Sequence, residues 1–317
     1  MLELKSVVSI DIGSSLIKLI KLSQSSGKIR LEKLGVVDNP ASNFRTDGYE
    51  KGKNAIVRAI RHSLRESRIK AKDVVSSLGG PSIIVQYFKF PALSRKELEN
   101  AVHLEAQRVM GSRLNQMETD FQILPQNQER AEGQEILFAA VPKETVHQHM
   151  RTLQEAGLNP IAVDIDCLAL ANCFLRLKNL DSDEQVMVLN LGARLISLGI
   201  LGKETLFFVR DISLNLKTSL DFQQVSILDR AVEEIRRSMH YYEGRPGGKK
   251  VARVFLTGGG TATPDTTDLF SKALEMPVEK WNPLEALDFN RDKLGYEFKE
   301  NQGYLLAIAI GLALREK

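Results

Sequence analysis

The sequence predicts an α/β protein made of two related halves, with a small α+β block inserted into the first. A strand, a glycine-containing turn and a second strand occupy residues 7–22, and the same layout returns about 180 residues later, at 184–201. Strand-like and helical segments alternate between these two units. With 317 residues the chain also exceeds the size of a single comfortable core, which favours more than one domain.

The first half begins with three predicted strands that follow one another in a meander, over residues 7–12, 16–22 and 31–37. A helix is expected next, because apolar residues recur with helical period over 54–68. The segment 58–72 is locally basic, and we interpret it as an amphipathic helix with a solvated face rather than as a site for anionic lipid.

The inserted block is predicted over residues 75–159, where strand-like runs and two helices alternate. Ser94 followed by Glu97 has the spacing of a capping box, so we expect a helix over 94–110 that begins after Ser94. Gly157 is expected to end the second helix of the block, because glycine readily adopts the left-handed conformation that closes a helix.

The second half repeats the opening layout, with a third strand at 204–212, a helix over 227–243 and a strand that runs into three glycines. The predicted domains are 1–74 and 160–183 for the first half, 75–159 for the inserted block, 184–301 for the second half and 302–317 for a C-terminal helix that returns to the first half.

Composition excludes several functional classes. The 43 basic and 40 acidic residues give a net charge of +3, which is too even to indicate nucleic-acid binding. The longest apolar run has 11 residues, at 304–314, against the roughly 20 that span a bilayer. The N-terminus has no signal-peptide pattern. Cys167 and Cys173 are expected to be reduced core residues, which fits a cytoplasmic location.

The first predicted turn carries more polar residues than a hairpin needs. Gly13 lets the backbone approach an anion, and the hydroxyl groups of Ser14 and Ser15 can donate hydrogen bonds to phosphate oxygens. Lys18 can add a positive charge, and Asp11 is placed to hold Mg²⁺ through water. The alternative is a plain hairpin with a glycine at its corner.

The second predicted turn contains Asn190, Gly192 and Ala193. Asn190 stands where the first turn has an acid, so it can form hydrogen bonds but brings no negative charge to a metal. The next residue, Arg194, can contact phosphate, although we favour an exposed turn residue.

Three glycines, Gly258, Gly259 and Gly260, follow a β-rich run. Such a run lets the backbone pass flat against a ring or a phosphate, and a strand-to-helix turn seldom needs three glycines. Thr261 is then a candidate cap for the next helix. We therefore favour a ligand contact over a purely structural turn.

Asp164 and Asp166 alternate along a predicted strand, which points both carboxylates to the same side. A pair of carboxylates can coordinate a metal or orient a water molecule. A strand end with Asp166 capping the following helix explains the same pattern, and we favour this second interpretation.

The order of these motifs resembles a known family. "DIGSSLIK", an early inserted block, "VDIDCLALANCF", "LNLGARLISLGIL", "EEIRRSMHYYEG" and "VFLTGGGT" occur in this order along nearly the whole chain. Together they resemble the PilM family, actin-like cytoplasmic proteins of type IV pilus assembly. They are more distantly similar to FtsA and to the cytoplasmic domain of GspL.

The resemblance implies an actin-like (ribonuclease H-like) fold whose two halves flank a cleft for ATP and Mg²⁺. Asp11 would be the magnesium residue, and Asp166 would lie near the attacking water. The nucleotide-binding positions that the resemblance implies are Asp11, Gly13, Ser14, Ser15, Lys18, Asn190, Gly192, Ala193, Glu233, Arg237, Gly258, Gly259, Gly260 and Thr261.

The chain also departs from the family pattern. Relatives usually carry an acid at the position of Asn190 and a threonine near that of Leu195. They also have a helical subdomain that covers the nucleotide, for which residues 209–235 leave little room. Because a phosphate clamp works by surrounding charge with donors and metal, we expect a shortened covering subdomain, weak or lost nucleotide binding and little or no ATPase activity.

The resemblance further implies a partner, the cytoplasmic tail of a PilN-like single-pass inner-membrane protein, which would dock beside the inserted block. The strand-like run at 82–93 has alternating apolar residues, with Val85, Tyr87 and Lys89 on one face that can line a docking groove. An ordinary sheet strand explains the same alternation. Other pilus or secretion platform proteins and further copies of this chain are possible partners, whereas direct membrane insertion is not expected.

Two other functions stay open. An ATP-binding switch or ATPase of actin type would close its halves around the nucleotide. A small-molecule kinase of the same fold is the least favoured, because no catalytic acid stands clearly in the predicted cleft.

Overall fold

The computed structural model describes residues 7–25, 27–43, 49–124, 133–180, 184–214, 227–245, 247–290, 294 and 300–315. The strands are β1 (Val8–Ile12), β2 (Leu16–Ser25), β3 (Lys28–Asp38), β4 (Asp73–Leu78), β5 (Ile84–Phe90), β6 (Met117–Ile123), β7 (Gln134–Pro142), β8 (Asn159–Ile165), β9 (Gln185–Leu191), β10 (Leu195–Gly202), β11 (Thr205–Ser213), β12 (Val251–Thr257), β13 (Val278–Lys280) and β14 (Asp288–Phe289). The α-helices are α1 (Tyr49–Glu66), α2 (Arg95–Met110), α3 (Lys143–Glu155), α4 (Asp166–Leu177), α5 (Ile227–Glu243), α6 (Thr266–Leu274) and α7 (Ala307–Ala313).

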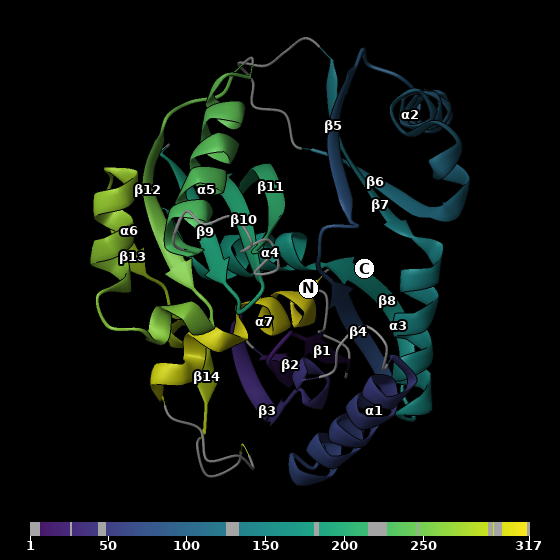
Figure 1. The fold of residues 1–317 in the computed structure, drawn as a ribbon, viewed down its shortest axis with the longest axis vertical. Coiled ribbons are helices and arrows are strands. Elements are labelled where there is room, and N and C mark those ends of the chain that lie inside the picture. Colours follow the sequence, from purple (N-terminus) through teal and green to yellow (C-terminus); the bar gives the residue numbers. More distant parts are fainter. Residues whose placement is uncertain are drawn as a thin grey trace, which may run out of the picture.

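The first half is built on a sheet with the strand order β14-β3-β2-β1-β4-β8 (Figure 1). β1, β2 and β3 form the antiparallel meander that the sequence predicts, and β4 and β8 extend it in parallel. On one face Ile60 of α1 and Leu153 of α3 pack with Ile10 and Leu19. On the other face the Ser9 hydroxyl donates a 2.6 Å hydrogen bond to the Ala309 carbonyl of α7. Helices therefore cover both faces.

The second half has a sheet with the order β11-β10-β9-β12-β13, in which β9, β10 and β11 repeat the meander of β1, β2 and β3. Successive residues of β9 point to opposite faces. Val188 packs with Phe174 of α4, whereas Leu189 packs with Ile235 of α5 and Phe270 of α6. The predicted internal repeat is thus confirmed as two meanders of the same topology.

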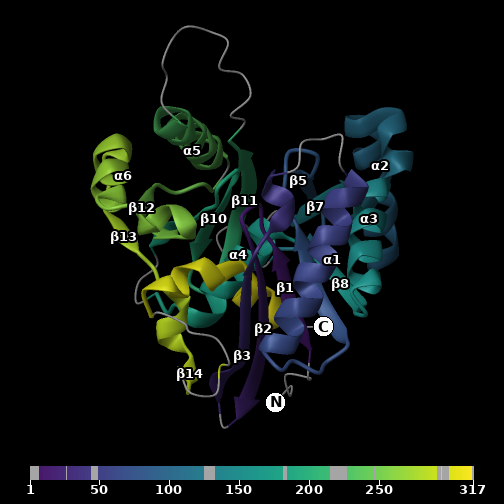
Figure 2. The same cartoon turned by 60° about the horizontal axis from the view of Figure 1, so that its bottom comes forward.

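The inserted block has its own sheet, in the order β5-β7-β6, with α2 on one face (Figure 2). Phe88, Phe138 and Val102 form its core. The capping box at the start of α2 is confirmed, with Ser94 as the N-cap and Glu97 as its reciprocal partner. β4 and α3, which the 75–159 boundaries place in the block, instead join the sheet of the first half. Alternation of strands and helices does not reveal which sheet a strand joins.

Two helices cross where the halves meet. α7 lies so close to α4 that a Cβ atom on Gly311 would lie 1.8 Å from the Ala169 carbonyl oxygen. Asn172 of α4 donates a 2.6 Å hydrogen bond to the Gly311 carbonyl. The C-terminal segment therefore returns to the first half as predicted, although the α-helix begins only at Ala307, after a 3₁₀ segment (Glu300–Leu306).

None of the helices in the described ranges is both long enough and apolar enough to cross a membrane.

Candidate functional site

The first turn, between β1 and β2, holds a buried ion pair. Asp11 and Lys18 are directly opposite each other in the antiparallel register, and Lys18 Nζ lies 2.6 Å from Asp11 Oδ2. Asp11 is only 3% exposed. A Cβ on Gly13 would come within 3.2 Å of Lys18 Nζ, so glycine leaves the space that the ammonium group occupies. The ammonium group of Lys18, which the sequence analysis assigned to phosphate, is thus paired with Asp11, which it assigned to Mg²⁺.

The rest of the first turn is open to a ligand. Asn39 fixes the backbone, because its N–H donates to the Ser15 carbonyl and its side-chain amide donates to the Gly13 carbonyl, both at 2.8 Å. Ser15 is exposed, and the hydroxyl groups of Ser14 and Ser15 form no hydrogen bond with a described residue. The hydrogen-bond donors of this turn therefore fit a phosphate.

The second turn and the three glycines lie against each other. A Cβ on Gly258, where φ is +90°, would lie 2.7 Å from Asn190 Oδ1, and one on Gly260 would lie 2.8 Å from Leu191 Cβ. Close packing against β9 therefore requires these two glycines, whereas Gly259 has only Leu305 nearby, at 3.5 Å. The structure thus provides a reason for two of the glycines that involves no ligand.

Thr261 does not cap the next α-helix, contrary to the sequence expectation. Its buried hydroxyl donates a 2.7 Å hydrogen bond back to the Gly258 carbonyl, and α6 begins only after Asp265. Gly192 is required by the backbone, because a Cβ there would lie 2.6 Å from the Leu195 carbonyl oxygen, and its neighbour Ala193 is exposed.

Three carboxylates from three elements meet between the halves, and we call Asp11, Asp166 and Asp211 the acid cluster. Asp166 is the first residue of α4 and accepts a 2.6 Å hydrogen bond from the Ser77 hydroxyl. Burial, followed by the charges of Asp11 and Asp211, raises the pKa of Asp166 to about 8. At neutral pH this carboxyl group is therefore mostly protonated. The expected capping role is wrong, because Ile165 is the N-cap of α4 and Asp166 makes no capping bond.

Asp211 is the member that the sequence analysis missed. It lies on β11, where burial raises its pKa to about 6 and the Ser197 hydroxyl and the Gly80 N–H partly offset the rise. Neither carboxylate oxygen is in a well-aligned hydrogen bond with a described residue. The available signal was the acid in "TLFFVRDIS", because an acid between the apolar residues of a strand requires an explanation even beside Arg210.

The surroundings of the acid cluster are partly apolar. A Cβ on Gly79 would lie 2.2 Å from Asp166 Oδ2 and 2.6 Å from Leu195 Cδ2, so both side chains pack against this one glycine. Leu195 brings a hydrocarbon side chain next to the second turn. Among the described residues no group of three His, Cys, Asp or Glu side chains is arranged to hold a metal ion.

The two remaining nucleotide candidates lie on the surface of α5. Glu233 and Arg237 are 60% and 62% exposed and form an ion pair with each other, and Arg237 also contacts Glu234 at 3.0 Å. The segment 215–226, which is the connection between β11 and α5 within the region 209–235 where the shortened subdomain is predicted, lies outside the described residues.

The face of β5 that the sequence assigns to a partner has contacts within the molecule. Val85 and Tyr87 pack against the core that includes the second half, and only Lys89 is exposed. The partner role of these three residues stays a prediction.

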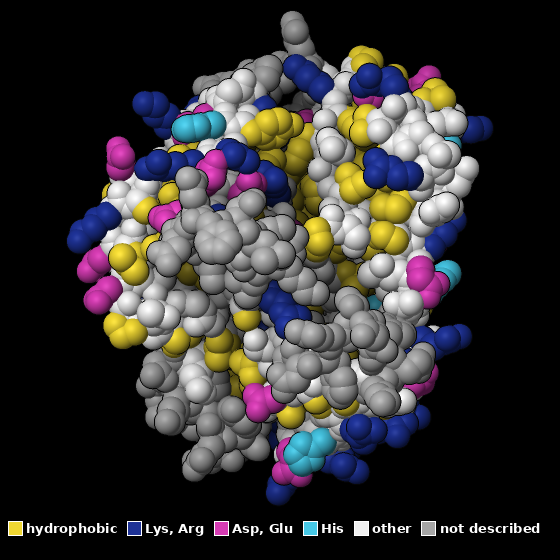
Figure 3. Space-filling model, viewed as in Figure 1, with side chains coloured by type: hydrophobic (Ala, Val, Ile, Leu, Met, Phe, Trp, Pro, Cys, Tyr) yellow, Lys and Arg dark blue, Asp and Glu magenta, His cyan; other side chains and the backbone are white. Residues whose placement is uncertain are grey.

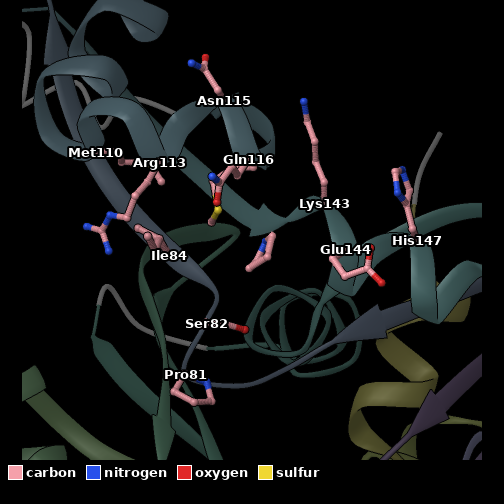
Figure 4. Close-up of a pocket in the computed structure, with 12 residues that line it drawn as sticks. Pro81, Ser82, Ile84, Met110, Arg113, Asn115, Gln116, Lys143, Glu144 and His147 are labelled. Carbon is pink, nitrogen blue, oxygen red and sulfur yellow. The ribbon is translucent and has the colours of Figure 1, made fainter. Parts of the chain in front are cut away.

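A cavity of about 700 Å³ lies beside the inserted block, and we call it the block groove (Figure 4). Ile84, Met110, Met117 and Pro142 give it an apolar floor. The other lining residues are Pro81, Ser82, Arg113, Asn115, Gln116, Lys143, Glu144 and His147. It thus lies between the sheet of the block and the start of α3, and β5 contributes to it through Ile84.

The two meanders, the helices that cross between them and the acid cluster at their junction define an actin-like protein. A Bacteroides thetaiotaomicron protein of unknown function with an actin-like ATPase fold is similar to this chain, with a TM-score of 0.51 and 11% identity over 89% of this chain and 92% of that one. The cytoplasmic domain of EpsL, an inner-membrane component of the type II secretion system of Vibrio cholerae, aligns with a TM-score of 0.47 and 11% identity over 95% and 93% of the two chains.

A more similar fold is that of a chain in a solved PilM-PilN type IV pilus biogenesis complex, with a TM-score of 0.82 and 24% identity over 98% of both chains. The family model for the type IV pilus assembly protein PilM matches residues 9–215 and 226–317 of this sequence. The chain therefore belongs to the PilM family.

Proposed function

We propose that this chain is a cytoplasmic scaffold of the inner-membrane complex that assembles type IV pili. It docks the cytoplasmic tail of a PilN-like membrane protein in the block groove and binds nucleotide weakly or not at all. The observation that carries the proposal is the groove itself, whose volume of about 700 Å³ and apolar floor suit a short peptide with a few apolar anchors. Membership of the PilM family and similarity to a chain of a PilM-PilN complex support the choice of partner.

The groove lies on the opposite face of β5 from the residues that the sequence suggested. Successive side chains of a strand point to opposite faces, so Ile84 lines the groove while Val85 packs inward. Arg113 and Lys143 supply positive charge at the rim, and both are exposed (Figure 4). A docked tail would thus be anchored on the floor and oriented at the rim.

Two tryptophan variants test the location of the docking site. Ser82→Trp places a bulky ring in the groove from an exposed position, whereas Lys89→Trp places the same ring at an exposed position of β5 that does not line it. With a synthetic tail peptide of the PilN-like partner, we expect Ser82→Trp to weaken the affinity at least tenfold, and Lys89→Trp to leave it unchanged. The reverse pattern would return the site to the face that includes Lys89, and equal affinities would contradict the groove as the site.

The first turn supports a second candidate function, that of an ATP-binding switch, because its donors fit a phosphate. Isothermal titration with ATP and Mg²⁺ on the native chain and on Asn190→Asp separates the two. The scaffold proposal expects no micromolar binding by the native chain, because Asn190 and Leu195 leave the second turn without an acid and with an apolar neighbour. Micromolar binding by the native chain would favour the switch.

A further inference from the structure

An aromatic side chain of the inserted block contacts the second half. The ring of Tyr87 on β5 stacks on that of Phe208 on β11, with the ring centres 5.5 Å apart and the planes 26° from parallel. The guanidinium group of Arg245, which follows α5, lies 4.5 Å from the centre of the same tyrosine ring. In Figures 1 and 2 β5 is the strand of the block nearest to β11. The contact therefore joins two parts of the chain that are more than a hundred residues apart.

The hydroxyl group of Tyr87 completes the hydrogen bonding of β11. Because β11 is the edge strand of its sheet, none of the described strands pairs with its outward N–H groups. The Val209 N–H donates a 2.6 Å hydrogen bond to Tyr87 Oη. Burial raises the pKa of Tyr87, so the hydroxyl stays neutral. Tyr87 thus takes the place of a strand partner at this position.

An ion pair strengthens the same contact. Arg245 pairs with Glu135 on β7 of the block, and the two side chains are only 19% and 24% exposed. Arg245 therefore contacts the block at two residues, Glu135 and Tyr87. Hydrophobic side chains also gather on the visible surface where the block meets the second half (Figure 3).

We propose that Tyr87, Glu135, Phe208 and Arg245 form a latch that fixes the inserted block to the second half and holds the two halves at one separation without a bound nucleotide. The block is joined to the first half by the connections from β4 and into α3, so the latch closes a bridge from the first half through the block to the second. Opening the junction around the acid cluster requires separating the stacked rings, the Val209 hydrogen bond and the ion pair together. The latch is independent of where the partner tail binds.

Spin-label distances test the latch on the full chain. Cys167 and Cys173 are buried, so labels attach at engineered cysteines, His103→Cys on α2 and Lys272→Cys on α6, both at exposed positions. Pulsed dipolar spectroscopy should give one narrow distance distribution in the parent, unchanged by ATP and Mg²⁺. Tyr87→Phe and Arg245→Gln, singly and combined, should broaden the distribution or shift it to longer distances, with the largest effect in the double variant.

The matched control is Tyr241→Phe. Tyr241 also packs against Phe208, with ring centres 5.7 Å apart, but it belongs to α5 of the same half. Loss of its hydroxyl should leave the distribution unchanged. A double variant of Tyr87 and Arg245 with the parent's distribution overturns the latch. So does a parent whose broad distribution narrows only when ATP is added, because nucleotide would then set the separation. The Tyr→Phe variants keep the aromatic ring and Arg245→Gln keeps a polar side chain, and circular dichroism will check that each variant folds.

Discussion

The raised pKa of Asp166 predicts that the folded protein loses stability as the pH rises. An ordinary aspartate has a pKa of 3.8, and that of folded Asp166 is about 8. Between these values the unfolded chain has released the proton that the folded chain retains, so the free energy of unfolding falls with increasing pH and stops falling near pH 8. One pKa unit corresponds to about 1.4 kcal/mol, which gives at most about 4 kcal/mol between about pH 5 and about pH 8. Asp166 keeps some contact with solvent, which reduces the cost of its charged form, so we expect about half of this limit, about 2 kcal/mol.

Asp166→Asn tests this prediction, because the amide is neutral at every pH and its oxygen can still accept the hydrogen bond from Ser77. Urea unfolding at about pH 5 and about pH 8.5 should show a smaller loss of stability in Asp166→Asn than in the parent. Asp211, with a pKa of about 6, gives both proteins a residual loss in the same direction. Asp268→Asn, at an exposed position of α6, should behave as the parent. Equal losses in the parent and Asp166→Asn would refute the buried, protonated carboxyl.

Two further predictions concern packing and the first turn. Gly311→Ala should lower the free energy of unfolding by about 2–3 kcal/mol, because the new Cβ meets the Ala169 backbone. Gly259→Ala should cost less than about 0.5 kcal/mol, because it meets only one side-chain carbon at 3.5 Å, and denaturant unfolding of both variants measures the difference. Asp11→Asn should destabilise the protein by about 3 kcal/mol, because it leaves the mostly buried ammonium group of Lys18 without its counter-charge. The addition of Lys18→Gln should recover most of that loss. A double variant as unstable as Asp11→Asn would contradict this account of the pair.

Local sequence signals predicted the helices, strands and turns of the fold. Long-range packing determines which sheet each element joins, and for β4 and α3 this was not predicted. The capping box at Ser94 and the glycine turn at Gly157, with φ +91°, depend only on neighbouring residues and were visible in the sequence. The assignment of β4 and α3 to the first sheet depends on partners far along the chain, which no local period encodes. For the same reason the inward face of β5 could be predicted as apolar but not as the face that contacts β11.

The candidate site was predicted in part, because its two turns carry visible glycines and its acids do not share a motif. Asp211 could not be predicted as a site residue, because its place in the site depends on its contact with other elements. For the three glycines the sequence analysis favoured a ligand contact over a structural turn, whereas the contacts of Gly258 and Gly260 with β9 support a structural reason. A run of glycines indicates that something packs closely against the backbone. The sequence alone does not distinguish a ligand from a neighbouring strand.

The charge balance of the acid cluster favours the scaffold over the switch. Three carboxyl groups converge with one ammonium group, and Lys18 is engaged by Asp11. A bare phosphate that entered between the turns would meet a cation whose charge is already compensated, and would approach carboxyl groups that become more negative as the pH rises. The second half offers it an amide and a hydrocarbon side chain, Asn190 and Leu195, in place of further charge or metal ligands. The latch needs none of these groups, so the junction can keep its geometry with an amide, Asn190, in place of an acid in the second turn.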